Sequence, residues 1–110
     1  MAGLFLRLSI GDAGNLGPGK ARLLELVEQT GSIRAAAAKM RLSYRRAWLL
    51  LKDIEKVFGT VLVRRTGGKA GGGAALNSRG REIVRHFRAA ERKAERAVRG
   101  ELEALASLKD

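Results

Sequence analysis

Cysteine is absent from this sequence of 110 residues, and proline, histidine and tryptophan each occur once. Without cysteine there are no disulfides and no thiolate ligands, and a lone histidine, His86, argues against a zinc cluster. No apolar run approaches the ~20 residues of a membrane-spanning helix. The run Leu4-Phe5-Leu6 is short for a secretion signal and is followed by Arg7, so we expect a cytoplasmic protein without a membrane partner.

Paired catalytic groups are missing as well. The sequence has one histidine and no cysteine, and its acidic residues are scattered over helices and not paired in an apolar pocket. Glu91 and Glu95 lie among arginines at the spacing of ion pairs on a helix surface, which is typical of a solvated face. We therefore expect no enzymatic activity, no metal and no cofactor.

Acidic residues are few, with 11 against 22 lysines and arginines, so the formal charge is +11. The excess is concentrated in residues 34–99, which hold 18 basic and 5 acidic side chains. Such a segment binds phosphates by releasing condensed counterions, which favours nucleic acid as the partner. The same positive charge would also suit a solvated surface, a protein that binds membranes or one that binds an acidic partner. Charge alone therefore leaves these alternatives open.

Residues 31–48 read as two short helices with a tight turn, which is a helix-turn-helix. Gly31 can close a preceding helix, and Ser32 can cap the next one, whose apolar residues recur at helical spacing. Arg41 and Leu42 make the turn. Ser43 then offers a second cap in front of a basic first turn, where a recognition helix presents side chains to DNA.

The flanking residues supply the rest of one compact domain. Alternation over residues 4–10 predicts a half-buried strand, and residues 11–19 are read as a loop that ends where Pro18 begins a helix. That helix runs to Gly31. A third helix, residues 43–58, has one apolar face, with Ala47, Leu51, Ile54 and Phe58, and an opposite face with Arg45, Trp48 and Lys52.

Beyond residue 59 the pattern changes to two short strands, residues 61–64 and 74–76, separated by a glycine-rich stretch. After a helix-turn-helix, such a hairpin is a wing whose glycines let the backbone approach phosphates. A flexible linker is the alternative, because glycine-rich segments are flexible by default. The fold class that follows is mostly α with a small β component: a winged helix-turn-helix over residues 1–77.

Residues 78–108 predict a long helix with Ser78 as its cap and no proline to interrupt it. Its length of ~45 Å takes it beyond a small domain, so its apolar seam would pair with the same helix of a second chain. A charged, solvated helix is the alternative. The residues expected to mediate dimerisation are Leu4, Leu6, Ile83, Phe87, Ala90, Ala94, Ala97, Leu102 and Leu105.

Residues 14–20 match the first seven positions of a phosphate-binding loop of nucleotide hydrolases. However, Ala21 stands where a hydroxyl should hold Mg²⁺, and no strand ending in aspartate follows to complete the metal site. We therefore interpret this segment as a turn and a helix start.

Several motifs together resemble the winged-helix DNA-binding domain of the ModE molybdate-dependent transcriptional regulators. They are Gly31-Ser32-Ile33, Ala36-Ala37, Ser43-Tyr44-Arg45-Arg46-Ala47-Trp48, Gly67-Gly68-Lys69, Gly71-Gly72-Gly73-Ala74 and Leu76. The resemblance runs from the first strand to the long helix and is specific enough to prefer ModE over the related LysR-type regulators, which share the layout. Asn77 replaces the family's usual threonine, a conservative change at a helix start.

The resemblance implies control of genes for molybdate uptake or molybdoenzyme use. Members of that family continue into a molybdate-binding domain, whereas this sequence ends at Asp110. We therefore expect that a separate protein senses molybdate, that regulation is constitutive, or that the targets differ. A sequence-tolerant architectural DNA-binding protein, a LysR-like regulator with unrelated targets and a protein-interaction module built on the long helix are the other interpretations.

We expect a homodimer that binds double-stranded, palindromic DNA. Arginine reads guanine most often, so Arg45 is the leading candidate for base recognition. Trp48 either roofs the core or contacts DNA. The residues expected to contact DNA are Ser32, Ser43, Tyr44, Arg45, Arg46, Trp48, Lys52, Arg64, Arg65 and Lys69.

Overall fold

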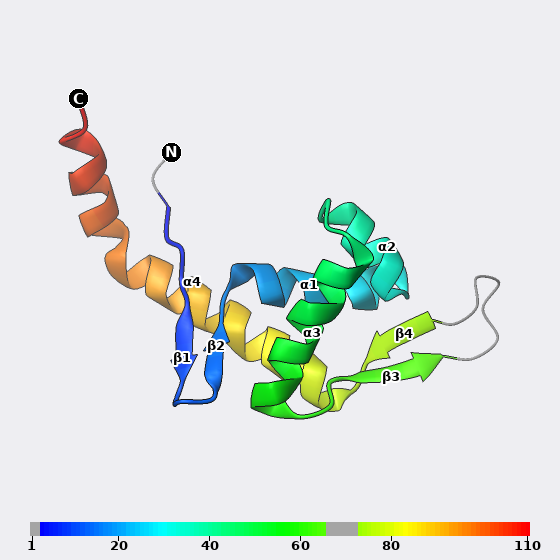
Figure 1. The fold of residues 1–110 in the computed structure, drawn as a ribbon. Coiled ribbons are helices and arrows are strands. Elements are labelled where there is room, and N and C mark those ends of the chain that lie inside the picture. The colour runs from blue at the N-terminus through cyan, green and yellow to red at the C-terminus, as the bar shows by residue number, and fades with distance from the viewer. Residues whose placement is uncertain (1–2, 66–72) are drawn as a thin grey trace.

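The computed structural model describes residues 3–65 and 73–110, which form three short helices, two strand pairs and one long helix (Figure 1). In chain order the elements are β1 (Leu8–Ile10), β2 (Gly14–Leu16), α1 (Pro18–Thr30), α2 (Ile33–Lys39), α3 (Tyr44–Phe58), β3 (Leu62–Arg65), β4 (Gly73–Leu76) and α4 (Ser78–Ser107). The predicted fold class, a winged helix-turn-helix with a long C-terminal helix, is confirmed.

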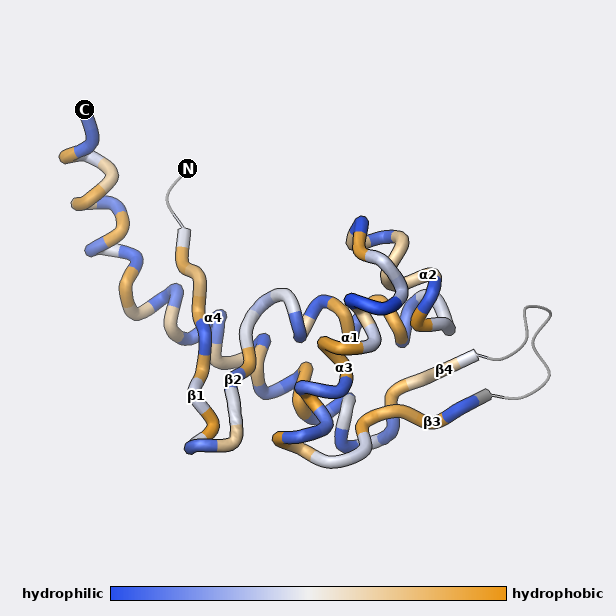
Figure 2. Tube along the Cα trace, viewed as in Figure 1, coloured by the Kyte–Doolittle hydropathy of each residue, from blue (hydrophilic) through white to orange (hydrophobic). Residues whose placement is uncertain are grey.

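The core lies where α1, α2 and α3 meet the root of the β3-β4 hairpin and the first half of α4. Its largest fully buried side chains are Phe87, Leu23, Leu24, Ile54, Val27 and Val61. The predicted apolar faces of α1 and α3 therefore do form the core. Figure 2 shows that hydrophilic and hydrophobic residues alternate along α4 as well, including the half that extends beyond the core.

Gly31 and Arg41 set the turns on the two sides of α2. Gly31 ends α1 in the left-handed conformation, with φ of 81°, and its N–H donates to the carbonyl oxygen of Val27. Arg41 has φ of 57°, an uncommon conformation for a residue with a side chain, between α2 and α3. Both turns lie where the sequence predicted them.

The N-terminal strand is shorter than predicted, and a second strand occupies part of the predicted loop. β1 pairs antiparallel with β2, in the register Leu8 opposite Leu16. Gly17 caps α1 and Pro18 begins it, so β2 is only three residues long and leaves residues 3–7 no strand to pair with. Leu4 and Leu6 are nevertheless half-buried, in keeping with the predicted alternation.

The β3-β4 hairpin is the wing, with residues 62–65 paired to residues 73–76. Two charged side chains hold its inner strand. Glu28 of α1 accepts a hydrogen bond from the N–H of Leu76, and Arg81 of α4 donates to the carbonyl oxygen of the same residue, at 3.1 and 2.8 Å. The N–H of Ala74 also donates to the carbonyl oxygen of Gly31, so β4 is attached directly to the turn between α1 and α2.

The N-cap of α4 lies one residue before the position that the sequence indicated. Asn77, not Ser78, is the N-cap, because its side-chain oxygen accepts a hydrogen bond from the N–H of Gly80. The amide group of Asn77 also donates to the carbonyl oxygen of Thr60. A threonine or serine at this position could cap the helix but has no amide to reach across, so asparagine joins the helix start to the wing.

Arg88 attaches α4 to α1. Its guanidinium makes two hydrogen bonds to the Glu25 carboxylate, at 2.7 and 3.1 Å, and a third to Glu91 at 2.7 Å. The hydrogen bonds to Glu25, more than the bond to Glu91, raise the pKa of Arg88 above its ordinary value, although partial burial acts to lower that pKa. The bidentate geometry fixes the orientation of α4 as well as its distance from α1.

Among residues 3–65 and 73–110, no helix is both long enough and apolar enough to cross a membrane.

Gly80 lies where α4 approaches the wing most closely, so its replacement by alanine should destabilise the protein. A β-carbon there would lie 2.6 Å from the Val61 carbonyl oxygen and 3.2 Å from Leu76. Relief of that overlap should cost about 1–3 kcal/mol, more than the ~1 kcal/mol that alanine gains over glycine in a helix. Urea denaturation measures the difference.

Gly100→Ala is the matched control, because a β-carbon at Gly100 meets nothing within 4 Å. That variant should gain up to ~1 kcal/mol of stability. Equal stability of the two variants would contradict the close contact at Gly80.

Candidate nucleic-acid interface

Two serine caps place the start of α2 and of α3. Ser32 accepts a hydrogen bond from the N–H of Ala35 at 2.9 Å, and Ser43 accepts one from the N–H of Arg46 at 3.1 Å. Each cap satisfies one free amide of the first turn. The hydroxyl oxygens of the two predicted DNA-contacting serines are therefore engaged in capping, which leaves their hydroxyl hydrogens to donate to a phosphate.

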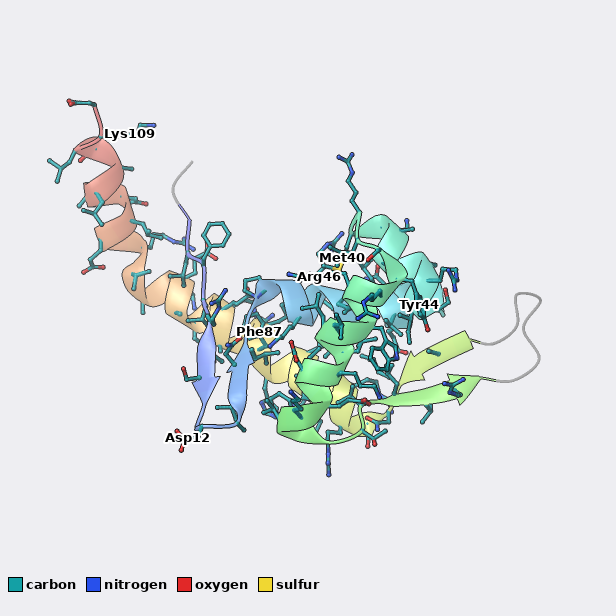
Figure 3. The ribbon with its side chains drawn as sticks, viewed as in Figure 1. Asp12, Met40, Tyr44, Arg46, Phe87 and Lys109 are labelled. Carbon is teal, nitrogen blue, oxygen red and sulfur yellow. The ribbon has the colours of Figure 1, made fainter. Side chains whose placement is uncertain are left out.

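The exposed side of α3 carries the residues that the sequence assigned to DNA. Ala47, Leu51 and Ile54 are buried against the core, and the opposite side of the helix faces outward. Figure 3 shows Tyr44 and Arg46 at the N-terminal end of α3. We call this outward surface the reading face; its members are Tyr44, Arg45, Trp48, Leu49, Lys52 and Lys56.

Trp48 belongs to the reading face and not to the core, because 43% of its surface is exposed. Of the two interpretations that the sequence left open for Trp48, core packing is thereby excluded. Tyr44 and Leu49 are exposed to almost the same extent, 42% and 41%. Three neighbouring large apolar groups in water are unusual for a small domain and mark a surface that contacts a partner.

Cationic side chains stack on both aromatic rings of this face. The guanidinium of Arg34 lies 4.6 Å from the ring centre of Tyr44, and the ammonium of Lys52 lies 5.1 Å from that of Trp48. The attraction between cation and ring holds each charge beside α3. Arg34 was not predicted, although its place as an exposed basic residue in the first turn of α2 could have indicated it.

Of the basic residues on the exposed side of α3, Lys52 is paired with an acid, whereas the two arginines are not. Glu55 of α3 accepts from Lys52 and from the N–H of Val61, and Asp53, the other acid of α3, forms no ion pair with any described residue. Arg45 and Arg46 form no ion pair with any residue that the structure describes. Their charges are therefore available to an anionic partner.

The wing contributes one fully described basic side chain. Arg64 of β3 is exposed, next to Val63, which exposes 48% of its surface. Arg65 is the last residue of β3, and Lys69 falls outside the described residues.

The structure divides the predicted dimer residues into two groups. Ile83 and Phe87 are 7% and 1% exposed and pack inside their own chain, which corrects their assignment to a dimer contact. The reason is that the first half of α4 covers the core. The residues that remain accessible are Leu4, Leu6, Ala90, Ala94, Ala97, Leu102 and Leu105.

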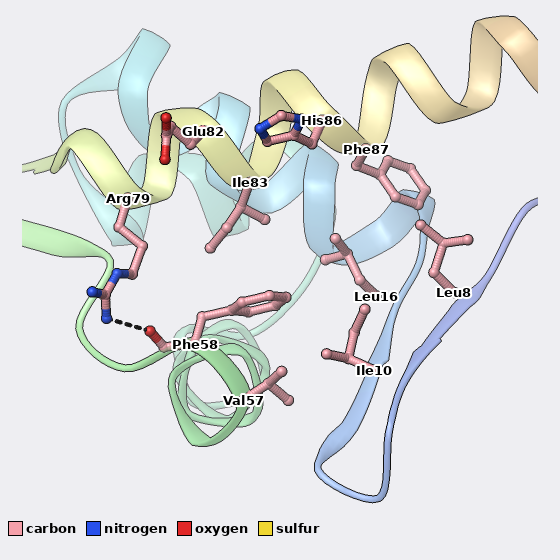
Figure 4. A pocket seen from close by; sticks show the side chains of 10 residues that line it. All are labelled: Leu8, Ile10, Leu16, Val57, Phe58, Arg79, Glu82, Ile83, His86 and Phe87. Carbon is pink, nitrogen blue, oxygen red and sulfur yellow. Dashed lines mark hydrogen bonds between the residues drawn. The ribbon is translucent and has the colours of Figure 1, made fainter.

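The phosphate-loop motif does not form a nucleotide cradle. Residues 14–16 are strand β2, and Lys20 donates to the carbonyl oxygen of Asn15 at 3.1 Å instead of facing an open loop. An apolar pocket of about 490 Å³ lies nearby, between the β1-β2 hairpin, the end of α3 and α4 (Figure 4). No metal-binding group of histidine, aspartate and glutamate occurs in the described part of the chain.

Comparison with known proteins agrees with this geometry. Residues 19–81, from the start of α1 to the start of α4, match the family described as "Bacterial regulatory helix-turn-helix protein, lysR family". The "Transcriptional regulator ModE" of Haemophilus influenzae is 35% identical over 95 residues, covering 86% of this chain and 37% of that protein.

Two further relatives bear similar names. The "Molybdenum transport protein ModE" of Azotobacter vinelandii is 39% identical over 92 residues, or 83% of this chain and 33% of the relative. The "DNA-binding transcriptional dual regulator ModE" of Escherichia coli K12 is 34% identical over 71 residues, which cover 64% of this chain and 27% of that relative. The chain thus spans about a third of the length of these relatives.

The matched region contains the complete helix-turn-helix and both strands of the wing. The resemblance to ModE regulators that the sequence motifs indicated is confirmed by these relatives. The chain belongs to the lysR family of bacterial regulatory helix-turn-helix proteins, whose members are DNA-binding regulators and not enzymes.

Proposed function

We propose that the reading face of α3 enters the major groove of a palindromic operator and that the protein regulates genes of molybdate transport or molybdenum metabolism. The observation that carries the DNA-reading part is the combination of exposed aromatic rings and unpaired arginines on one capped helix. The major groove is ~12 Å wide and admits such a helix. The molybdate part is supported by the names of the relatives.

Base recognition is assigned to the middle of the reading face. Arg45 is exposed and unpaired, so its guanidinium can make two hydrogen bonds to a guanine. Trp48 and Leu49 are apolar and exposed beside it, which suits contact with thymine methyl groups. Arg45, Trp48 and Leu49 are therefore proposed to determine the preferred sequence.

Phosphate contacts are assigned to the edges of the same surface. Arg34 is held beside Tyr44 at the start of α2, and Arg64 projects from the wing. Both side chains would flank the groove that α3 enters. Ser32, Ser43, Arg46, Arg65 and Lys69 remain further candidates for this role.

Dimerisation is proposed to use the second half of α4, where Ala94 and Leu105 lie on the helical side that Phe87 occupies nearer the core. Leu105 exposes 65% of its surface, and Leu108 exposes 79%. A twofold pair of such helices would bury these groups and place two reading faces on a palindrome.

Molybdate is proposed to be sensed by a separate protein and not by the helix-turn-helix itself. Oxyanions often bind the free amides at helix starts. At α2, α3 and α4 a first-turn amide already donates to the capping side chain of Ser32, Ser43 or Asn77. This supports a sensor outside these helix starts.

Arg45→Ala should weaken operator binding by about 1–3 kcal/mol and relax the preference at one base pair. Arg64→Ala should weaken all duplexes alike and flatten the dependence of affinity on salt. Selection of bound sequences from a random duplex pool, followed by anisotropy titrations at several salt concentrations, measures both effects. An unchanged sequence preference in Arg45→Ala would contradict the proposed orientation of α3.

Leu105→Glu should dissociate the dimer. Because burial of a leucine contributes about 1.5–3 kcal/mol, the dimer dissociation constant should rise at least about tenfold. Light scattering after gel filtration measures the mass. Ala106→Glu adds the same charge at the next exposed position, away from the seam, and should leave the dimer intact; equal masses for the two variants would count against the seam.

Calorimetric titration of the chain with molybdate should give no micromolar binding. Sulfate is the matched control, since it is a tetrahedral dianion of similar charge. Saturable heat with molybdate alone would place a sensor within this chain.

A further inference from the structure

Arginines follow one face of α4 for most of its length. Their spacing of 4, 3, 4, 4 and 3 residues returns them to the same side at each turn, within a sector of about 80° and over a length of about 27 Å. No lysine takes part in this row. We call it the arginine face; its members are Arg81, Arg85, Arg88, Arg92, Arg96 and Arg99.

The arginine face lies on the opposite side of α4 from Ile83 and Phe87, and its inner members Arg81 and Arg88 reach Glu28 and Glu25 of α1. Ile83 and Phe87 extend from the opposite side of the helix toward Phe58 of α3 and Leu16 of β2 (Figure 4). The second half of α4 extends away from α3 and the wing (Figure 1). The last three arginines of the row, Arg92, Arg96 and Arg99, therefore lie apart from the reading face of α3.

The inner arginines of this row have partners within the chain. Arg81 forms an ion pair with Glu28, Arg88 with Glu25 and Glu91, and Arg85 with Glu82. These contacts position the first half of the helix and take up part of its charge.

The outer arginines make no such contacts. Among the described residues, none forms an ion pair with Arg92, Arg96 or Arg99. Glu95 and Glu103 each lie one turn from Arg99, and neither approaches it within ion-pair distance. Three exposed guanidinium groups at successive turns thus present unneutralised charge.

We propose that the outer part of the arginine face, Arg92, Arg96 and Arg99, binds the phosphate backbone of a second duplex segment while α3 reads the first. The protein then bridges two segments of DNA. Guanidinium groups match phosphate oxygens through paired hydrogen bonds, and a duplex offers one negative charge per ~1.7 Å along its axis. A row of arginines with one helical turn between members suits such a repeating anion.

Duplex DNA is favoured over an acidic protein as the occupant because the reading face already holds DNA. Once one segment is bound, neighbouring segments of the same molecule are present at high effective concentration. The bridging proposal therefore rests on the DNA-reading function of α3. It is compatible with the proposed dimer, since Ala94 and Leu105 lie on the other side of α4 from the arginine row.

A two-duplex capture assay tests the proposal. The full chain is loaded on a duplex fixed to beads, and retention of the chain is measured before a fluorescent second duplex is added. Wild type should capture the second duplex. The triple variant R92Q/R96Q/R99Q should stay bound to the beads but capture at least about tenfold less, because its backbone contacts are lost.

The matched control is R22Q/K93Q/K109Q, which removes the same net charge from exposed positions outside the row. It should capture the second duplex as wild type does. Equal capture of the second duplex by R92Q/R96Q/R99Q and wild type would overturn the bridging role. An equal loss of capture in R22Q/K93Q/K109Q would overturn it too, because the effect would then depend on net charge alone.

Two further outcomes separate this inference from the proposed function. Failure of wild type to stay on the beads would overturn both DNA reading and bridging. Retention without capture of a second duplex would overturn bridging alone. Retention together with capture of a fluorescent polyglutamate peptide in place of the second duplex would assign the arginine face to an acidic protein and likewise overturn it.

Discussion

The close approach of Gly80 to the carbonyl oxygen of Val61 is the contact on which the arrangement of the reading face, the wing and α4 depends. At this junction the end of α3, both strands of the wing and the start of α4 meet. Val61 donates to Glu55 of α3 and accepts from the N–H of Asn77, so one residue is tied to the reading helix and to the long helix. A side chain at Gly80 would separate α4 from the wing and so change the orientation of the wing relative to α3.

The polar contacts around this junction engage backbone groups that have lost their strand or helix partners. Arg79 donates to the carbonyl oxygen of Phe58 at the end of α3, and Glu28 accepts from the N–H of Leu76 in β4. Buried or half-buried backbone groups without partners would cost free energy. Charged side chains that satisfy them do two things at once: they stabilise short elements and they connect elements far apart in the sequence. This explains why strands of only four residues suffice for the wing.

The elements that could be predicted from the sequence are those with a local signal. Gly31, Ser32 and Ser43 marked helix ends correctly because caps act within three residues. β2 was missed because its three residues carry no alternation of their own and form a strand only through pairing with β1. The burial of Ile83 and Phe87 was assigned to the wrong neighbour for a similar reason: periodicity shows that a face is apolar but not which surface covers it.

Periodicity was equally unable to decide which residues of the reading face are exposed. Periodicity placed Trp48 beside both the core residues and the exposed ones, and only the packing of α3 resolved the choice. Once exposed, Trp48 and Tyr44 each hold a cation, and this pairing accounts for aromatic residues on a surface that must bind an anion. A lysine or arginine alone would move freely in water, whereas attraction to the ring beneath it holds the charge beside α3. The aromatic residues therefore serve the electrostatics of the face as well as its shape, which is why they occur in its first two turns, next to the arginines.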